Sequence, residues 1–329
     1  MSAPDAETVL AEVRGRAGRR DWSGVRSFAG HPAMAFSIEF GLLVSEAELR
    51  QGESELAKTR LTDLVVAAKQ RHSGPAVRRA TNMLGAACFE RGELVEAESA
   101  FEDALAEATR DADYLTAARA TNNLGLIANI RGRHETALAM YRVALPAYQR
   151  LGFSIGMGET THNIAITLRD LGQYEEADRY ERRAIEFAAD ASNTRLGAMA
   201  RTGRAEIGLH RGEAAVAAAE ARRALTDYQE IGDQMGEADA HRVLGLGLLA
   251  LGANAEAGQH IVASLELATR SGASLLQAEA LAAHARVALA LDDRERAASD
   301  VEQAIAAYQA LGADGDRAAL EHWWEQATG

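Results

Sequence analysis

A forty-residue period runs through most of the chain and constrains its fold more than any other feature. Two residue types recur at fixed phases of this period: a turn residue and, five positions later, a small residue. Glycine occupies six of the seven turn points, and alanine occupies all seven points of the second series. The turn residues are Gly52, Gly92, Gly132, Gly172, Gly212, Gly252 and Asp292, and the alanines are Ala57, Ala97, Ala137, Ala177, Ala217, Ala257 and Ala297. Self-similarity at a fixed period predicts a repeat architecture.

Each period is expected to form a hairpin of two helices. Glycine ends a helix because it takes the left-handed conformation without steric cost, and an early alanine lets the second helix approach the first closely. Because one hairpin cannot bury both of its faces, neighbouring hairpins must stack into a solenoid. Pro75 suits a helix start, whereas Pro146 falls inside an expected helix and should kink or shorten it.

The expected fold class is all-α, namely a right-handed α-solenoid of about seven forty-residue helical hairpins with capping helices at the ends. We expect a single solenoid over residues 1–329. A capping hairpin is expected at 1–33, seven repeats at 34–312 and a capping helix at 313–329. Abundant alanine, four prolines and an aromatic content of 5% agree with closely packed helices.

The end elements carry the three tryptophans. Trp22 lies in the N-terminal cap, and Trp323 and Trp324 lie in the C-terminal helix. Terminal units must cover an otherwise exposed core, and indole rings are large enough to do so. The alternative is that Trp323 and Trp324 form a surface through which copies of the chain associate.

Composition argues against several classes of partner. The net charge of −13 disfavours nucleic acid, because phosphate binding needs a concentrated basic surface. The acidic excess indicates either solvated helix faces or complementarity to a basic partner. No segment approaches 18 uninterrupted apolar residues and the N-terminus does not resemble a signal peptide, so we expect no membrane partner and a cytoplasmic location. Only two of the 35 basic residues are lysines, which indicates the codon usage of a GC-rich bacterial genome.

Residues that could support catalysis are few. The single cysteine, Cys88, falls on the packed face of its helix and is expected to be a core residue. The nine histidines show no metal-ligand spacing, and the glycine-rich stretches lack the features of a phosphate loop or a dinucleotide fold. We therefore expect no metal, no cofactor and no enzymatic activity.

The stretch NNLGLIANIRGRHETALAMYRVAL, residues 122–145, resembles a tetratricopeptide repeat. The family's pattern places Leu124 and Gly125 on the first helix, Gly132 at the turn and Tyr141 on the second helix. The forty-residue spacing is similar to that of kinesin light chains, G-protein-signalling adaptors and the sensor regions of bacterial transcriptional activators. The resemblance implies a solenoid that binds peptides, protein segments or small ligands, and it implies no shared chemistry.

In tetratricopeptide folds the first helix of each hairpin lines the concave surface. The resemblance therefore implies a row of polar side chains in a groove, where amides can pair with the backbone of an extended peptide and an arginine fork suits a carboxylate. The predicted clamp consists of Arg79, Asn82, Arg119, Asn122, Asn123, Asn129, His162, Asn163 and Arg169. The alternative is that these amides, Asn123 and Asn163 above all, bond to a neighbouring helix and hold two repeats in register.

Farther along the chain the inward positions become apolar. Leu246 and Leu249 belong to a predicted apolar shelf over roughly residues 246–290, suited to an amphipathic helix or a segment with aliphatic anchors. The competing explanation is that the curvature of the solenoid, its C-terminal helix or a second copy of the chain fills this shelf.

These observations favour a non-enzymatic adaptor or regulatory module that holds a peptide or protein segment in its concave groove. Two alternatives stay open at this point. One is a sensing regulator whose superhelix changes shape when it binds a small peptide or metabolite, and the other is a structural subunit that assembles with copies of itself.

Overall fold

The computed structural model describes residues 3–329, and it is helical almost throughout. Met1 and Ser2, which belong to the predicted N-terminal cap, lie outside the described residues. The chain divides into two compact units, unit 1 (residues 1–120) and unit 2 (residues 121–329), and each is described by itself. No strand occurs between residues 3 and 329, which confirms the all-α class. That both units belong to one continuous solenoid stays a prediction.

Unit 1 begins with a short irregular region and continues with regular hairpins. Its elements are α1 (Ala3–Gly18), α2 (Trp22–Arg26), the 3-10 helix η1 (Pro32–Phe36), α3 (Ile38–Arg50), α4 (Ser54–Gln70), α5 (Gly74–Glu90), α6 (Leu94–Arg110) and the start of α7 (Tyr114–Ile130). The second arm of the expected N-terminal hairpin is thus only five residues long. Val13, Val25 and Phe40 form the core that joins these first elements to α3.

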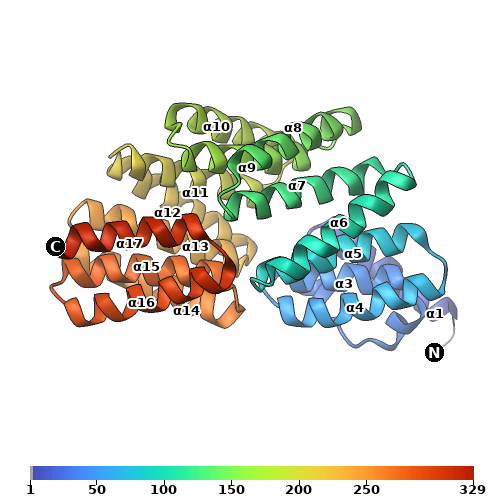
Figure 1. Ribbon diagram of the computed structural model, residues 1–329. Helices are drawn as coiled ribbons and strands as arrows, with labels where there is room; N and C mark the ends of the chain where they lie inside the picture. Colours follow the sequence, from blue (N-terminus) through green and yellow to red (C-terminus); the bar gives the residue numbers. More distant parts are fainter. Residues whose placement is uncertain (1–2) are drawn as a thin grey trace. The chain divides into compact units, whose positions relative to one another are not determined.

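Unit 2 contains the end of α7 and ten further helices among the described residues. They are α8 (His134–Leu151), α9 (Ser154–Asp170), α10 (Tyr174–Asp190), α11 (Thr194–His210), α12 (Ala214–Ile231), α13 (Gln234–Ala250), α14 (Asn254–Ser271), α15 (Ser274–Ala290), α16 (Arg294–Leu311) and α17 (Asp314–Thr328). From α8 to α17 each helix packs against the next one along the chain, as Figure 1 shows for the pairs α9 and α10 or α13 and α14.

The predicted turn points end the first helix of every hairpin. All six glycines of the series have positive φ, and Asp292 takes the same conformation with φ 64°. Glycine adopts this conformation freely and aspartate tolerates it, so the helix closes at the same phase in each repeat. The predicted series of helix ends is confirmed.

A second series of left-handed residues closes the second helix of every hairpin, half a period away from the first. The sequence analysis missed it, because only four of its seven members are glycines. The members are His72, Ala112, Gly152, Ser192, Gly232, Gly272 and Gly312. Where a residue other than glycine occupies such a position, the surrounding helices impose the conformation at a local cost.

The alanine series lies at the closest contact between the two helices of each hairpin. All seven alanines are completely buried. In α12, for example, Ala217 contacts the position where a Cβ on Gly208 of α11 would lie. A larger side chain there would force the helices apart, so this contact sets the geometry of each hairpin.

Pro146 does not shorten its helix, contrary to one of the expected outcomes. α8 continues past it to Leu151 and has 18 residues, one more than α6. A proline removes the hydrogen bond to the carbonyl four residues earlier, here that of Arg142. Both residues are exposed, so water can hydrogen-bond to that carbonyl.

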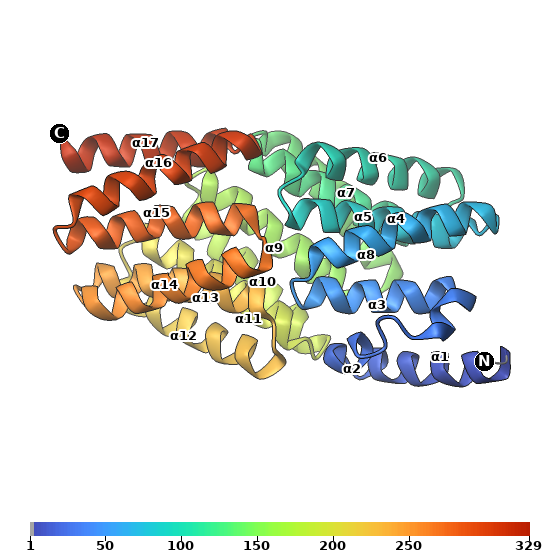
Figure 2. The same cartoon turned by 90° about the horizontal axis from the view of Figure 1, so that it is seen from below.

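The first helices of successive hairpins line one side of unit 2 and contact one another directly. Such contacts join α9 to α11, α11 to α13 and α13 to α15. At the end of the unit α15, α16 and α17 lie side by side (Figure 2). Ile130, the last residue of α7, packs against the apolar cluster of these three helices. The end of α7 therefore contacts the cluster formed by the last three helices of the unit.

The aromatic ring of the second helix packs against a glycine of the first helix in two hairpins, and this contact can be tested. In unit 2 a Cβ on Gly125 would lie 2.5 Å from Cε1 of Tyr141, which is fully buried. We expect Gly125→Ala to lower the free energy of unfolding by about 1–3 kcal/mol through overpacking. Chemical denaturation followed by circular dichroism measures this change.

Gly315→Ala is the matched control for that substitution. Gly315 also lies in a helix, α17, but no atom lies within 4 Å of the position of an added Cβ. The control should be neutral or stabilising by up to about 1 kcal/mol, because alanine favours helix more than glycine does. Equal effects of the two substitutions would contradict the packing argument.

Candidate functional site

The predicted clamp residues of unit 1 lie on α5 and at the start of α7. Arg79 is partly exposed, and its Nη2 pairs with Oε2 of Glu46 on α3 at 3.1 Å. Asn82 is buried, and its Oδ1 has no hydrogen-bond partner among the described residues. Arg119 is half-buried. In unit 1 the predicted clamp residues Arg79 and Arg119 are therefore partly exposed to solvent, whereas the predicted clamp residue Asn82 is buried.

The asparagines around the α7–α9 contact in unit 2 connect neighbouring repeats. Oδ1 of Asn122 accepts hydrogen bonds from Oγ1 of Thr160 at 2.9 Å and from Nδ2 of Asn163 at 3.2 Å. Asn122, Thr160 and Asn163 are buried, whereas Asn123 is half-buried. The hydrogen bond between Asn122 and Asn163 joins two neighbouring repeats, as in the alternative interpretation of these amides. It is made between two side chains and not to the backbone.

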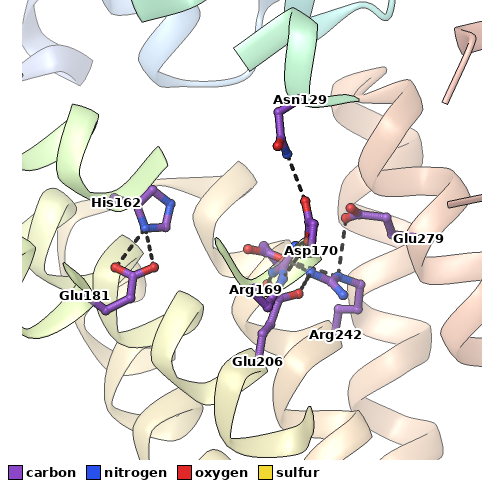
Figure 3. A network of polar contacts seen from close by, with 9 residues as sticks. Asn129, His162, Arg169, Asp170, Glu181, Glu206, Arg242 and Glu279 are labelled. Carbon is purple, nitrogen blue, oxygen red and sulfur yellow. Dashed lines mark hydrogen bonds and ion pairs between the residues drawn. The ribbon is translucent and has the colours of Figure 1, made fainter. Parts of the chain in front are cut away.

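Asn129, at the end of α7, uses both of its amide atoms, one toward the next repeat and one within its own hairpin. Its Nδ2 donates to Oδ2 of Asp170 on α9 at 2.9 Å, and its Oδ1 lies 3.0 Å from Nδ1 of His134. Asp170 in turn accepts from Nε of Arg169 at 3.0 Å. Asn129 and Arg169, both predicted clamp residues, are therefore brought together at the C-terminal end of α9 (Figure 3).

His162, another predicted clamp residue, lies between the two helices of its hairpin rather than on an open surface. Its Nδ1 is 2.8 Å from Oε1 of Glu181 on α10, and both side chains are buried. Glu181 occupies the phase at which Phe101 and Tyr141 stand in earlier repeats. Burial lowers the pKa of His162, but the adjacent Glu181 carboxylate outweighs this effect and leaves that pKa raised. Burial raises the pKa of Glu181 in spite of His162.

Four side chains from successive first helices form a row of alternating charge, which we call the charge ladder: Arg169, Glu206, Arg242 and Glu279. Arg169 pairs with Glu206, and Nη2 of Arg242 lies 2.5 Å from Oε1 of Glu206. Nε of Arg242 lies 3.5 Å from Oε2 of Glu279. The ladder connects α9, α11, α13 and α15 on the inner side of unit 2, as Figure 3 shows.

Sequence reasoning predicted only Arg169 of this ladder. Its members do not share one phase of the forty-residue period, because they follow each other at steps of 37, 36 and 37 residues, and a further step of 37 reaches Asp316 of α17. Each member thus lies about one helical turn earlier on its helix than the member before it. A search for charges at this shorter spacing could have found the ladder.

Carboxylates outnumber guanidinium groups around the ladder. Asp170, Asp239 and Asp316 join Glu206 and Glu279, and only Arg169 and Arg242 oppose these five acids within the network. Burial raises the pKa of Glu206, but the two arginines outweigh it and hold that pKa at about 2. Burial raises the pKa of Glu279 to about 8, and it also raises the pKa values of Asp239 and Asp316. The two arginines therefore do not balance the five acids: part of these carboxyl groups is protonated near neutral pH, and a cation placed beside them would favour their charged forms.

The predicted apolar shelf is partly covered by its own unit. Leu246 and Leu249 are half-buried and pack against the core that α11 to α15 share. Trp323 and Trp324 are also half-buried, and they pack against the core of α15, α16 and α17 rather than standing free. This contact agrees with a capping role, and self-association through these residues stays a prediction.

Residues with other possible chemistry are isolated. Cys88 is buried, and burial raises the pKa of its thiol to about 11. Within residues 3–329, no three or more His, Cys, Asp and Glu side chains are grouped so that they could hold a metal ion. None of the described helices combines the length and the apolar character that a membrane crossing needs.

Comparison with known proteins identifies the repeats. Two family profiles, each described as tetratricopeptide repeat, match residues 45–113 and 116–190. No curated protein matches the chain.

Solved structures share the fold at low sequence identity. A Rap protein complexed with competence and sporulation factor is 12% identical, with TM-score 0.65, and the match covers 99% of this chain and 98% of that one. The Rap conjugation gene regulator of plasmid pLS20, in complex with the Phr* peptide, is 16% identical, with TM-score 0.59 and coverage of 94% and 96%. NprR in complex with its cognate peptide NprX is 17% identical, with TM-score 0.56 and coverage of 69% and 67%.

The pair of His162 and Glu181 predicts a pH dependence of stability. Both pKa values are raised in the folded state. In the unfolded chain these pKa values are about 4.3 for Glu and about 6.5 for His. Above them the folded chain therefore binds more protons than the unfolded chain does. The contribution of this pair to stability should therefore fall as pH rises, from about 4.3 for Glu181 and from about 6.5 for His162. The double variant His162→Asn/Glu181→Leu carries the residues found at the same phases in earlier repeats, Asn122 and Leu61, and should lose this part of the slope.

Denaturation midpoints across this pH range measure the effect. Each single variant should be less stable than the wild type by about 3–5 kcal/mol, because it leaves one buried group unpaired, whereas the double variant should be near neutral. A double variant that keeps the full wild-type slope would show that other groups cause it.

The excess of carboxyl groups around the charge ladder predicts that neutralising one of these acids stabilises the chain. Between its unfolded pKa of about 4.3 and its folded pKa of about 8, Glu279 binds more protons in the folded chain, so wild-type stability falls as pH rises through this window. Glu279→Gln should raise the free energy of unfolding at pH 8 by about 1 kcal/mol, a modest gain because the side chain is partly solvated, and the gain should shrink toward pH 5. Glu266→Gln, on an exposed face of α14, is the control and should change little. If Glu279→Gln lowered the free energy of unfolding at pH 8, this result would contradict the excess of carboxyl groups around the charge ladder.

Proposed function

Because this chain belongs to the tetratricopeptide-repeat family, we propose that it is a regulator that binds a peptide or protein segment on the inner side of unit 2. The proposal makes the chain a binding module rather than an enzyme. It places the ligand along the first helices α9, α11, α13 and α15, beside the charge ladder.

The charge ladder carries this proposal. Side chains of both signs from four successive helices converge there, and Asp239 and Glu279 remain about one third exposed to solvent. A peptide supplies complementary groups for such a surface: backbone amides, charged side chains and its two termini. The surplus of carboxylates favours ligands that bring positive charge, such as a free N-terminal amine or a Lys or Arg side chain.

The structural relatives support a peptide as the ligand class. Three proteins that share this fold over most or all of their length were solved as complexes with a peptide or with a factor. Because their sequences are at most 17% identical to this chain, they support the class of ligand and not its sequence. The predicted clamp contributes Arg169 and Asn129 directly to this surface, whereas Asn122 and Asn163 use their amides between helices.

A regulatory role fits the contact between the two ends of unit 2. Ile130, the last residue of α7, packs against the apolar cluster of α15, α16 and α17. A ligand that binds between them has different contacts when they are together and when they separate, and such a difference is what allows binding to shift a conformational equilibrium.

Affinity selection with short peptides tests the proposal. The wild-type chain is mixed with a random pentapeptide mixture, separated by size exclusion, and the retained peptides are identified by mass spectrometry. We expect the wild type to retain peptides enriched in positive charge. The variant Asp239→Asn/Asp316→Asn should retain about tenfold less, since it removes two of the surplus carboxylates.

The matched control is Asp314→Asn/Glu266→Gln, which makes the same change of charge at exposed positions of α17 and α14. Equal helicity and denaturation midpoints must be verified for all chains. Retention of no peptide by the wild type, or equal loss in the control, would overturn the proposed binding surface.

A further inference from the structure

Arg286 of α15 is an arginine without a carboxylate partner. The carbon at the centre of its guanidinium group lies 4.4 Å from the centre of the Trp323 ring, which places the cation over the indole face. Among the described side chains no Asp or Glu pairs with it, although it is half-buried. Most other half-buried arginines of unit 2, such as Arg195, Arg201 and Arg204, have carboxylate partners.

The electrostatics of Arg286 agree with this geometry. Burial lowers its pKa, and the phenol of Tyr308 only partly compensates. In Arg169 and Arg242, by contrast, burial is outweighed by nearby carboxylates, which raise their pKa values. Removing a guanidinium from water without an anion is unfavourable, so this side chain retains the capacity to bind one.

The contact of Arg286 with Trp323 does not require the N–H groups of the guanidinium. A guanidinium uses its flat face to contact an aromatic ring, while its N–H groups point outward in the plane and match the two oxygens of a carboxylate. None of these N–H groups has a hydrogen-bond acceptor among the described residues. The indole thus orients the group without occupying its donors.

Arg286 lies on the same face of α15 as Glu279 of the charge ladder. The two residues are seven positions apart, which is two helical turns or about 10 Å. Burial lowers the pKa of His210 on α11, and the nearby charges of Arg169 and, less strongly, Arg286 act in the same direction. The inner side of unit 2 therefore presents an excess of carboxyl groups and, two turns away along α15, one guanidinium group without a carboxylate partner.

We propose that Arg286, oriented by Trp323, is the subsite that binds the C-terminal carboxylate of the peptide ligand. This inference rests on the proposed function and specifies the polarity of the bound peptide. The amino end or a cationic side chain lies at the carboxylates around Glu279, and the free carboxyl end lies at Arg286. A separation of about 10 Å corresponds to three extended residues, so a short linear peptide can reach both subsites.

Two pentapeptide mixtures of the same composition test this assignment, one with free C-terminal acids and one with C-terminal amides. We expect the wild type to retain the acids about tenfold more than the amides, since a bidentate charged hydrogen bond is lost in the amide. Arg286→Gln should abolish this preference and still retain the amides as the wild type does. Arg286→Lys should keep only part of the preference, because an ammonium group lacks the planar fork.

Arg294→Gln is the matched control, because it removes one positive charge at the exposed start of the neighbouring helix α16. It should keep the wild-type preference for acids. Arg286→Gln should also be at least as stable as the wild type without ligand, a result that a purely structural role for Arg286 would not give. Equal retention of acids and amides by the wild type would mean that Arg286 binds an Asp or Glu side chain of the peptide, or that it binds no carboxylate. Either result overturns the proposal.

A second measurement tests Arg286 independently of any peptide. In a Trp22→Phe background the only tryptophans are Trp323 and Trp324, so fluorescence reports on α17. Sodium acetate, titrated against sodium chloride at constant ionic strength, should change the emission in a saturable way that Arg286→Gln abolishes and Arg294→Gln preserves. If the wild type retains no peptide, the proposed function fails and this titration alone decides the anion site. Absence of a saturable change would overturn it.

Discussion

The close approach of two helices at a buried alanine is the contact on which the rest of this structure depends. Because the residue at this phase of the second helix is a completely buried alanine in every hairpin, the second helix can approach the first closely, and successive hairpins can stack with their first helices on one side. That stacking, in turn, brings side chains from α9, α11, α13 and α15 into one row. The charge ladder therefore exists because a small residue recurs elsewhere, on the second helices.

The hairpins could be predicted from the sequence because their determinants are local. A glycine that ends a helix and an alanine that permits a close contact act within about twenty residues, and both leave a visible period. The second series of helix ends was missed for a physical reason. At Ala112 and Ser192 the left-handed conformation is imposed by packing, and alanine and serine are not residue types from which this conformation can be predicted. Pro146 shows the converse, since its solvent-facing position allows a helix to continue through a residue that usually interrupts one.

The candidate site was less predictable, because it depends on how each repeat is displaced relative to the one before. Reading inward positions at a constant phase found Arg169 and Asn129 but not Glu206, Arg242 or Glu279. The neighbouring amides of Asn122 and Asn163 illustrate the same limit, since an inward phase places them between α7 and α9 rather than in a groove. Arg286 could not be singled out from the sequence. What distinguishes it is that it contacts Trp323 of α17 and has no carboxylate partner among the described residues, and only the structure shows this.

The alternation of charge along the ladder also limits how this chain can change its length. Repeat proteins gain and lose whole repeats, and loss of residues 193–232 would preserve every turn and every buried alanine on either side. Because the ladder advances by about 37 residues and not by 40, however, Leu246 would then take the place of Glu206 beside Arg169. Loss of two consecutive repeats would bring Arg286 to the same place, so that two cations would meet without an anion between them. The interior of unit 2 is thus a stricter constraint on the evolution of the chain than its hairpins are: a whole repeat can be lost without harm to the hairpins but not without harm to the ladder.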